Sequence, residues 1–366
     1  MSKERRLSTG SDVDSLSPRR VALSLTLTAL TAVLPNLVPI AGAQTGRPLV
    51  KVVATGGTVA NTPDGRISVE RIITELPEVK SIADLRVEDV SRLGSSELTF
   101  QELIDTAKAI ERTFAEEPEV DAVVVTHGSN TSEETAYFLN LVIDSEKPIV
   151  VTAAQRQRTT RSEDSSRNFI DAVITAGSPD ARGKGVLLVA NELIHSARDV
   201  TKNVVSRVDS WQSLDVGALG IVSGREAVFY REPTRRHTTN SEFSLNGITR
   251  AGQLPSVEII YSYIDADPEI IRAAVTEAGA DGLVVAGFAT GIPHIGQFEA
   301  LESAAVSGGV AVVIGSRGSS GRLASRSEPP YIGGDNLSPQ KARILLMCAL
   351  TVTRDRAEIQ RIFDEY

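Results

Sequence analysis

Residues 49–58 have the sequence LVKVVATGGT. The first six are apolar apart from Lys51 and rich in valine, which predicts a buried β-strand. Gly56 and Gly57 then allow a tight turn of the backbone, and Thr58 is expected at the edge of the sheet. A strand followed by two glycines is common and usually only structural, so this segment alone does not indicate a function.

Further apolar runs along the chain alternate with segments of helical spacing. In residues 132–143, apolar side chains recur three and four positions apart after Glu133 and Glu134, which predicts a helix. Strands that are apolar throughout and alternate with helices indicate an α/β fold whose mostly parallel sheet is covered on both faces. Active residues are then expected at the carboxyl ends of the strands. The other predicted strands are residues 122–126, 149–153, 185–190, 283–286 and 310–314.

A polar stretch from Arg235 to Leu254, with several Thr, Ser, Asn and Gly residues, predicts a linker between a larger first domain and a smaller second one. The 366 residues, 41% of them hydrophobic, are enough for one large or two moderate domains. We therefore expect an N-terminal α/β domain at residues 46–240, a linker at 241–255 and a C-terminal α/β domain at 256–366.

Residues 1–45 have the pattern of a secretory leader. Arg19 and Arg20 precede an apolar stretch, residues 21–34, and residues 41–43 (Ala-Gly-Ala) have the small side chains that a signal peptidase needs. We expect export to the periplasm or the medium and, once the leader is removed, no stable membrane association. The apolar stretch is short for a membrane span. A retained membrane anchor is the competing interpretation, and the Sec and twin-arginine routes both stay open.

The composition argues against several kinds of partner and site. With a net charge of -9 the chain offers no basic face for nucleic acid, and an aromatic content of 4% argues against platforms for stacked bases. Cys348 is the only cysteine, so neither an internal disulfide nor a thiolate zinc site is expected. Its place in an apolar run indicates a small buried side chain. The four histidines are scattered and suggest no metal site.

Two more polar segments carry candidate chemistry. Residues 126–135 (THGSNTSEET) follow a predicted strand and lead into a helix with an acidic first turn, as the helix dipole favours. An ordinary helix cap made by Ser129, Asn130 or Thr131 is the alternative interpretation. Residues 198–202 (RDVTK) end in Lys202. A lysine is usually a solvated surface charge, but beside a hydroxyl nucleophile it could lower the cost of deprotonation.

These three segments, in this order, resemble the signatures of the asparaginase/glutaminase family. Residues 55–60 (TGGTVA) are similar to its N-terminal signature, residues 126–135 to its second signature, and residues 197–202 to its lysine segment. The likeness covers essentially residues 49–366 and points to a type II, exported L-asparaginase. It implies a larger N-terminal α/β domain, a smaller flavodoxin-like C-terminal domain, and a homotetramer of intimate dimers in which a neighbour's C-terminal domain helps to close each site.

The resemblance also implies a mechanism and a substrate. Thr58 would attack the amide carbon, ammonia would leave, and water would release the acyl-enzyme. Ser129 and Lys202 would accept and donate the protons, while backbone N–H groups would stabilise the oxyanion. The partner is then a small-molecule amide, L-asparagine with L-glutamine left open. No metal or organic cofactor is needed.

Several positions expected to bind the substrate depart from the family pattern. Ser129 replaces the second catalytic threonine and keeps only the hydroxyl. Asn130 replaces an aspartate that pairs with the substrate's α-ammonium group, and Ser95 with Ser96 replaces a Ser-Gln pair that holds its α-carboxylate. Ala154 is a further expected substrate contact.

Two more expected contacts would come from a neighbouring subunit. Asp265 stands where the family usually has an asparagine, and Glu328 matches the neighbour's glutamate. The loop after Thr58 is short, and no tyrosine lies between Thr58 and Pro77, so the family's catalytic lid tyrosine has no counterpart there.

Three interpretations follow. The leading one is an exported L-asparaginase or glutaminase-asparaginase. The second is an amidase for blocked or peptide-linked amides, because the groups that bind a free amino acid are altered while Thr58 and Lys202 are kept. The third is a catalytically weak homologue that binds a small ligand, which the missing tyrosine favours and the retained hydroxyls and lysine oppose.

Overall fold

We describe the protein from a computed structural model, which describes residues 46–62, 65–323 and 330–366. The predicted leader at residues 1–45 and the candidate residue Glu328 lie outside these ranges, and Thr58 is described by its backbone alone. Two sheets organise the chain. We call residues 46–229, which contain the larger sheet, the first lobe, and residues 256–366, which contain the smaller one, the second lobe.

The sheet of the first lobe has eight strands in the order β12-β11-β8-β7-β6-β5-β1-β4. The five strands β4, β1, β5, β6 and β7 are parallel, whereas β8, β11 and β12 complete the edge in antiparallel pairing. The carboxyl ends of β4, β1 and β5 are level, because Ala54 is in register with both Asp89 and Thr126. The strands are β1 Leu49–Ala54, β4 Asp84–Asp89, β5 Ala122–Thr126, β6 Ile149–Thr152, β7 Val186–Ala190, β8 Leu193–Ser196, β11 Gly220–Ser223 and β12 Glu226–Phe229.

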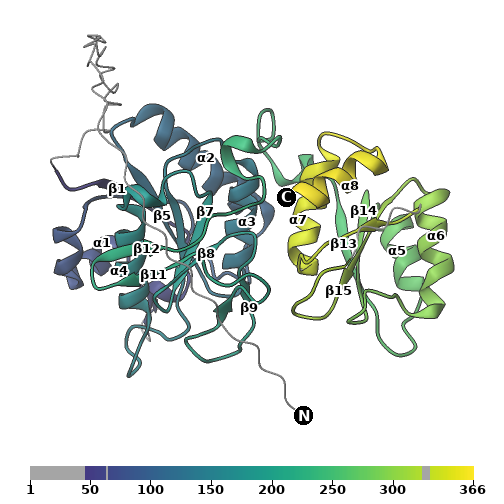
Figure 1. The fold of residues 1–366 in the computed structure, drawn as a ribbon, viewed down its shortest axis with the longest axis horizontal. Helices are drawn as coiled ribbons and strands as arrows, with labels where there is room; N and C mark the ends of the chain where they lie inside the picture. The colour runs from purple at the N-terminus through teal and green to yellow at the C-terminus, as the bar shows by residue number, and fades with distance from the viewer. Residues whose placement is uncertain (1–45, 63–64, 324–329) are drawn as a thin grey trace, which may run out of the picture. The chain divides into compact units, whose positions relative to one another are not determined.

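Helices cover both faces of this sheet (Figure 1). Successive strand side chains point to opposite faces. Val53 therefore belongs to the core beneath α2 and α3, while Val52 belongs to the core beneath α1 and α4. A strand that is buried on both sides has to be apolar at every position, which explains the run of valines in β1. The helices are α1 Val69–Glu75, α2 Phe100–Glu116, α3 Ser132–Val142 and α4 Ser165–Ala176.

Lys51 is the exception in β1, and its charge is neutralised within the protein. The residue is 7% exposed, and its ammonium forms ion pairs with Glu88 at 2.7 Å and Glu117 at 2.6 Å. Burial alone would lower the pKa of Lys51, but the hydrogen bonds to Glu117 and Glu88 outweigh it and raise the pKa.

The second lobe has a four-stranded parallel sheet in the order β13-β14-β15-β16. Helices α5 and α6 contribute to the core on one of its faces, and α7 and α8 contribute to the core on the other. The strands are β13 Val257–Tyr261, β14 Gly282–Gly287, β15 Ala311–Ser316 and β16 Ile332–Gly333. The helices are α5 Glu269–Thr276, α6 Phe298–Val306, α7 Pro339–Leu350 and α8 Arg356–Glu365.

One hydrophobic core joins the two lobes. Helix α3 packs on the first sheet and against α7, and α7 packs on the second sheet. The same cluster of buried side chains includes Val125 of β5, Phe138 of α3, Leu345 of α7 and Val284 of β14. The lobes are therefore continuous in packing as well as in sequence.

The remaining elements are short. Between β12 and β13 the chain has only two 3₁₀ turns, η4 Thr238–Asn240 and η5 Ala251–Gln253, in the polar stretch predicted as a linker. Two small hairpins pair β2 Asn61–Thr62 with β3 Gly65–Arg66 and β9 Thr201–Lys202 with β10 Trp211–Gln212. The other 3₁₀ turns are η1 Thr58–Ala60, η2 Pro77–Ser81, η3 Pro179–Ala181 and η6 Ile295–Gln297.

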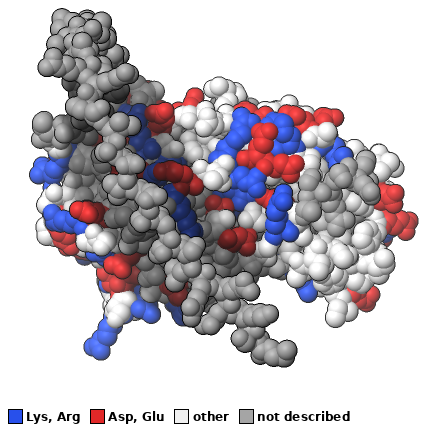
Figure 2. Space-filling model, in the orientation of Figure 1, with Lys and Arg blue, Asp and Glu red and all other residues white. Residues whose placement is uncertain are grey.

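On the face drawn in Figure 2, Lys and Arg side chains lie among Asp and Glu side chains. Among the ion pairs of the protein, Arg236 and Arg361 form a network with Glu242 and Glu365. No helix in the described part of the chain is long and apolar enough to cross a membrane.

The fold class predicted from the sequence is confirmed. The predicted strands appear within two residues at each end, and the predicted helix at residues 132–143 is α3. Strand β4 and the antiparallel edge strands β8, β11 and β12 were not predicted from the sequence. Strand β4 reads DLRVED and is only partly buried, so it lacks the apolar run that identified its neighbours.

Candidate active site

The glycine turn after β1 and the turn after β5 are in direct backbone contact. The amide and hydroxyl of Thr55 both donate to the carbonyl of Thr126, at 3.1 and 2.9 Å. Gly57 has a φ of 86°, and a Cβ built on it would lie 2.2 Å from the backbone nitrogen of Gly128. Only glycine fits at this approach. The first turn therefore brings Thr58, the residue that follows Gly57, next to residues 127–131.

Ser95 holds the second turn from a third loop. It is 6% exposed, its hydroxyl accepts a hydrogen bond from the amide of Asn130 at 3.2 Å, and its carbonyl accepts one from the Thr131 hydroxyl at 2.9 Å. Thr131 is the N-cap residue of α3, but its side chain makes no capping hydrogen bond. The side chain of Thr131 therefore does not act as an ordinary cap of α3. Ser96 and Asn130 are exposed.

Ser129 and Lys202 meet at the end of β5. The Lys202 ammonium donates to the Ser129 hydroxyl at 2.9 Å and lies 6.0 Å from the centre of the Trp211 ring. Partial burial lowers the pKa of Lys202, and the nearby Glu133 carboxylate opposes this shift. A lysine with a lowered pKa, in contact with a hydroxyl, can accept and return a proton.

Glu133 positions the strand that carries Lys202. This buried carboxylate accepts hydrogen bonds from the Thr201 hydroxyl and, at 3.4 Å, from the amide of Lys202. Trp211 pairs with Lys202 across the β9–β10 hairpin, and its indole N–H donates to the Ser132 hydroxyl at 3.1 Å. From the sequence, Glu133 was predicted only as part of an acidic helix turn, and Trp211 had no predicted role. For Glu133, only its closeness in sequence to Ser129, four residues earlier in the turn before α3, could have suggested its part in the site.

His127 is a structural residue of this turn. It is fully buried; one ring nitrogen lies 2.8 Å from the Gly128 carbonyl and the other 2.8 Å from the Thr135 hydroxyl. Since a carbonyl can only accept, Nδ1 carries the proton and Nε2 accepts from Thr135. Burial lowers the pKa of His127 to about 4, so the ring is neutral at physiological pH.

Two family models together cover nearly all of the chain beyond the predicted leader. The N-terminal asparaginase model matches residues 49–235, and the glutaminase/asparaginase C-terminal domain model matches residues 256–363. The chain belongs to the asparaginase family. It is 39% identical to L-asparaginase 2 of Bacillus subtilis over 332 residues, which cover 87% of each chain. It is 34% identical to L-asparaginase 2 of Escherichia coli, over 92% of this chain and 98% of that one.

A solved structure supports the fold of this asparaginase-family protein. The crystal structure of a probable cytoplasmic L-asparaginase from Campylobacter jejuni superimposes with a TM-score of 0.83 at 36% identity. The match covers 87% of this chain and all of that chain.

Ala154, a further predicted contact, lies in the turn after β6. It is buried, and the turn is fixed by two side chains of α4 and its N-cap. Asn168 donates to the carbonyl of Ala153 at 2.9 Å, and the Asp164 carboxylate accepts from the amides of Gln155 and Arg156 at 3.0 and 2.7 Å. This turn ends the strand next to β5, so it belongs to the same edge of the sheet.

Asp265 belongs to the second lobe. It follows β13 with a φ of 59° and is exposed. Among the contacts of the described residues, none links Asp265 with Ser129 or Lys202. The contribution of Asp265 and Glu328 to a site on a neighbouring subunit stays a prediction.

The chain after Thr58 forms a short hairpin. Strands β2 and β3 pair, the amide of Ile67 donates to the carbonyl of Ala60 at 2.9 Å, and α1 begins at Val69. Arg66 ties the hairpin to the neighbouring loop by donating to the Arg92 carbonyl. The segment has no tyrosine, so any aromatic side chain over the site must come from elsewhere.

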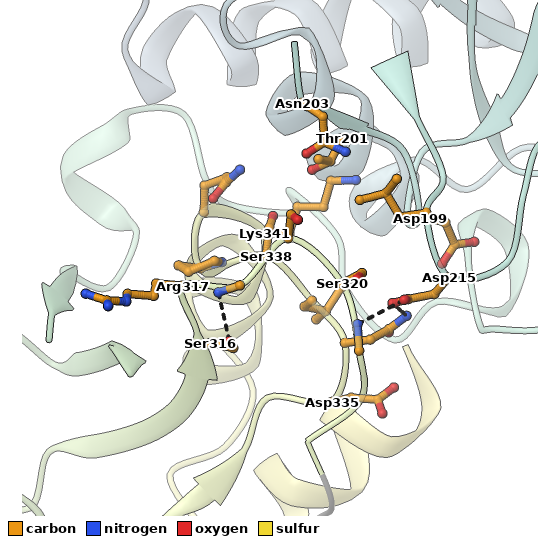
Figure 3. Close-up of a pocket in the computed structure, with 18 of the residues that line it drawn as sticks. Asp199, Thr201, Asn203, Asp215, Ser316, Arg317, Ser320, Asp335, Ser338 and Lys341 are labelled. Atoms are coloured by element: carbon orange, nitrogen blue, oxygen red, sulfur yellow. Dashed lines mark hydrogen bonds between the residues drawn. The ribbon is translucent and has the colours of Figure 1, made fainter. Parts of the chain in front are cut away.

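A cavity of about 440 Å³ adjoins Lys202 on the side of the second lobe. Figure 3 shows Asp199, Thr201 and Asn203 of the first lobe together with Ser316, Arg317 and Ser320, which follow or end β15. Neither Ser95 nor Ser129 lines this cavity. Within residues 46–62, 65–323 and 330–366, no group of three or more His, Cys, Asp or Glu side chains is arranged to hold a metal ion.

Proposed function

We propose that this protein is an amidohydrolase that releases ammonia from the side-chain amide of L-asparagine, and of L-glutamine, through an acyl-enzyme on Thr58. The observation that carries the proposal is the 2.9 Å contact between Lys202 and Ser129 beside the Gly57 turn, in a chain of the asparaginase family. The relatives named L-asparaginase support the choice of substrate.

The proposed reaction has two steps. The Thr58 oxygen bonds to the amide carbon while its proton passes towards Ser129 and the neutral form of Lys202. The C–N bond breaks, the proton goes to the leaving nitrogen, and ammonia departs. Water then attacks the ester, releases the side-chain carboxylate and restores the Thr58 hydroxyl. Backbone N–H groups of the two turns stabilise the oxyanion in both steps.

Ammonia release from a panel of free and blocked amides tests this function. We expect turnover of L-asparagine, weaker turnover of L-glutamine, and the least with amides whose α-amino group is blocked. A preference for blocked amides would favour the amidase interpretation. Tight binding of L-asparagine without ammonia release would favour a ligand-binding homologue.

The residue at position 130, Asn130, supports the alternative function, an amidase for blocked or peptide-linked amides. At this position an exposed neutral amide replaces the family's carboxylate. For Asn130→Asp we expect kcat/KM for L-asparagine to rise, because a charge-assisted hydrogen bond to the α-ammonium group contributes about 1.5–3 kcal/mol, or roughly ten- to a hundredfold. A blocked amide should show no such gain.

The measurement is kcat/KM for L-asparagine and for an α-N-blocked asparagine with both proteins. Ser96→Asp, which adds a carboxylate at the other altered position, is the matched control and should not favour L-asparagine. Equal changes for the two substrates would contradict the idea that position 130 binds the α-ammonium group.

We further propose that the protein is exported and that the mature chain begins near Gln44. The motif at residues 41–43 supports this, although the Campylobacter jejuni relative is named as probably cytoplasmic. Mass spectrometry of protein from the native host should find an N-terminus near Gln44 outside the cytoplasm. An intact N-terminus in the membrane fraction would support the anchor interpretation instead.

We also propose a homotetramer built from intimate dimers. The exposed position of Asp265 in the second lobe supports a role at a neighbour's site.

A further inference from the structure

Lys341 is a fully buried cation that binds backbone rather than a carboxylate. It lies in the first turn of α7 in the second lobe and is 2% exposed. Its ammonium donates to the carbonyls of Ala197 at 2.8 Å, Arg198 at 2.9 Å and Val200. These three bonds use all three protons of a lysine ammonium.

The three carbonyls belong to the segment that leads directly into Lys202. Residues 197–200 cross from β8 to β9, and β9 is Thr201–Lys202. From the other side, Glu133 of α3 binds Thr201 and the Lys202 amide. Gln340, the neighbour of Lys341, also reaches Glu133, at 3.4 Å. The Lys202 backbone is thus held between α3 and α7, and Figure 3 shows Lys341 in the same region as Asp199 and Thr201.

Burying the ammonium group of a lysine at this position costs free energy, which only its hydrogen bonds can offset. Its helix continues with Ala342, Ile344 and Leu345, all buried in the core that joins the lobes. Desolvation lowers the pKa of Lys341 to about 8, although Glu133 and Asp199 oppose the shift. An apolar side chain of similar length would avoid this desolvation, but it would leave three carbonyls without their donor.

We propose that Lys341 is a positioning residue for Lys202. By fixing the carbonyls of Ala197, Arg198 and Val200, it sets the path of β9 so that the Lys202 ammonium meets the Ser129 hydroxyl. The chemistry of the first lobe then depends on a helix of the second lobe. The inference rests on the proposed function insofar as Lys202 transfers protons there.

Kinetics of Lys341→Met and Lys341→Gln test the inference. For Lys341→Met we expect kcat to fall about a hundredfold, the effect of a displacement near 1 Å at a reacting group, with little change in KM. Lys341→Gln keeps two N–H donors and should recover part of the loss. A residue needed only for folding would lower the folded fraction and leave kcat per folded molecule unchanged.

A double-mutant cycle separates action through Lys202 from action on the protein as a whole. In a Lys202→Met background, adding Lys341→Met should cause little further loss of kcat, because the group that Lys341 positions is already gone. Lys51→Met is the matched control. Lys51 is also buried and forms ion pairs with Glu88 and Glu117, so its loss should lower Tm without changing kcat.

Crystal structures of wild type and Lys341→Gln give a readout that does not depend on turnover. We expect the distance from the Lys202 ammonium to the Ser129 hydroxyl to exceed hydrogen-bonding range in the variant. An unchanged distance, unchanged kcat in folded Lys341→Gln, or fully additive losses in the cycle would overturn the inference. If wild type hydrolyses no amide, the proposed function fails, while this distance still decides whether Lys341 positions Lys202.

Discussion

Replacing Thr58 by alanine is expected to abolish amide hydrolysis without unfolding the protein. Thr58 follows the Gly57 turn at the carboxyl end of β1, and that turn touches the backbone at Gly128. If the Thr58 hydroxyl is the nucleophile, alanine removes the oxygen that bonds to the amide carbon. The loss in kcat should be about 10⁴-fold or more, as for other nucleophiles that act within a catalytic unit.

The measurement is ammonia release from L-asparagine, with thermal unfolding as the check on the fold. Thr74→Ala is the matched control, because Thr74 is an exposed threonine of α1 whose hydroxyl donates to the Glu70 carbonyl of the same helix. Thr74→Ala should keep wild-type activity. Near-normal turnover by folded Thr58→Ala protein would remove Thr58 as the nucleophile.

Lys202→Met is expected to lower kcat by about 10² to 10⁴-fold, the usual contribution of a positioned acid-base group. Methionine keeps much of the apolar bulk of the lysine beside Trp211 but cannot bind Ser129 or carry a proton. Exposed Lys80, replaced by methionine in the same way, provides the control. Full activity of Lys202→Met would indicate that Lys202 is only a surface charge.

The pH profile gives a second readout for Lys202. Partial burial lowers the pKa of Lys202, so its neutral, proton-accepting form is more populated near neutrality than for a free lysine. Activity that needs this form should fall as the pH falls and Lys202 becomes protonated. The residual activity of Lys202→Met should lack that acidic limb.

The sequence predicted the strands that are buried on both sides, because such strands must be apolar throughout. It could not predict β4, whose charged residues lie on a partly exposed edge strand, or the antiparallel pairing of β8 with β11. The burial of Lys51 in β1 could not be explained from the neighbouring sequence. Its partners Glu88 and Glu117 are distant in sequence and meet it only in the folded sheet.

The same limit applies to the candidate site. The resemblance to the family singled out Ser129 and Lys202, which the structure joins at 2.9 Å. It assigned no role to Trp211 or Lys341, because their roles rest on contacts across a hairpin and between the lobes. The substrate contact of Ser95 stays a prediction; in this structure its hydroxyl and carbonyl accept hydrogen bonds from Asn130 and Thr131 and hold that turn.

The core shared by α3 and α7 means that neither lobe is a self-sufficient module. A fragment ending at residue 235 would lose α7 and turn the apolar flank of α3 towards water, where exposed hydrophobic surface promotes aggregation. The second lobe alone would expose the matching flank of α7. Gene fusion or domain exchange in the polar connection between β12 and β13 would therefore divide one hydrophobic core. Both lobes have to be inherited together.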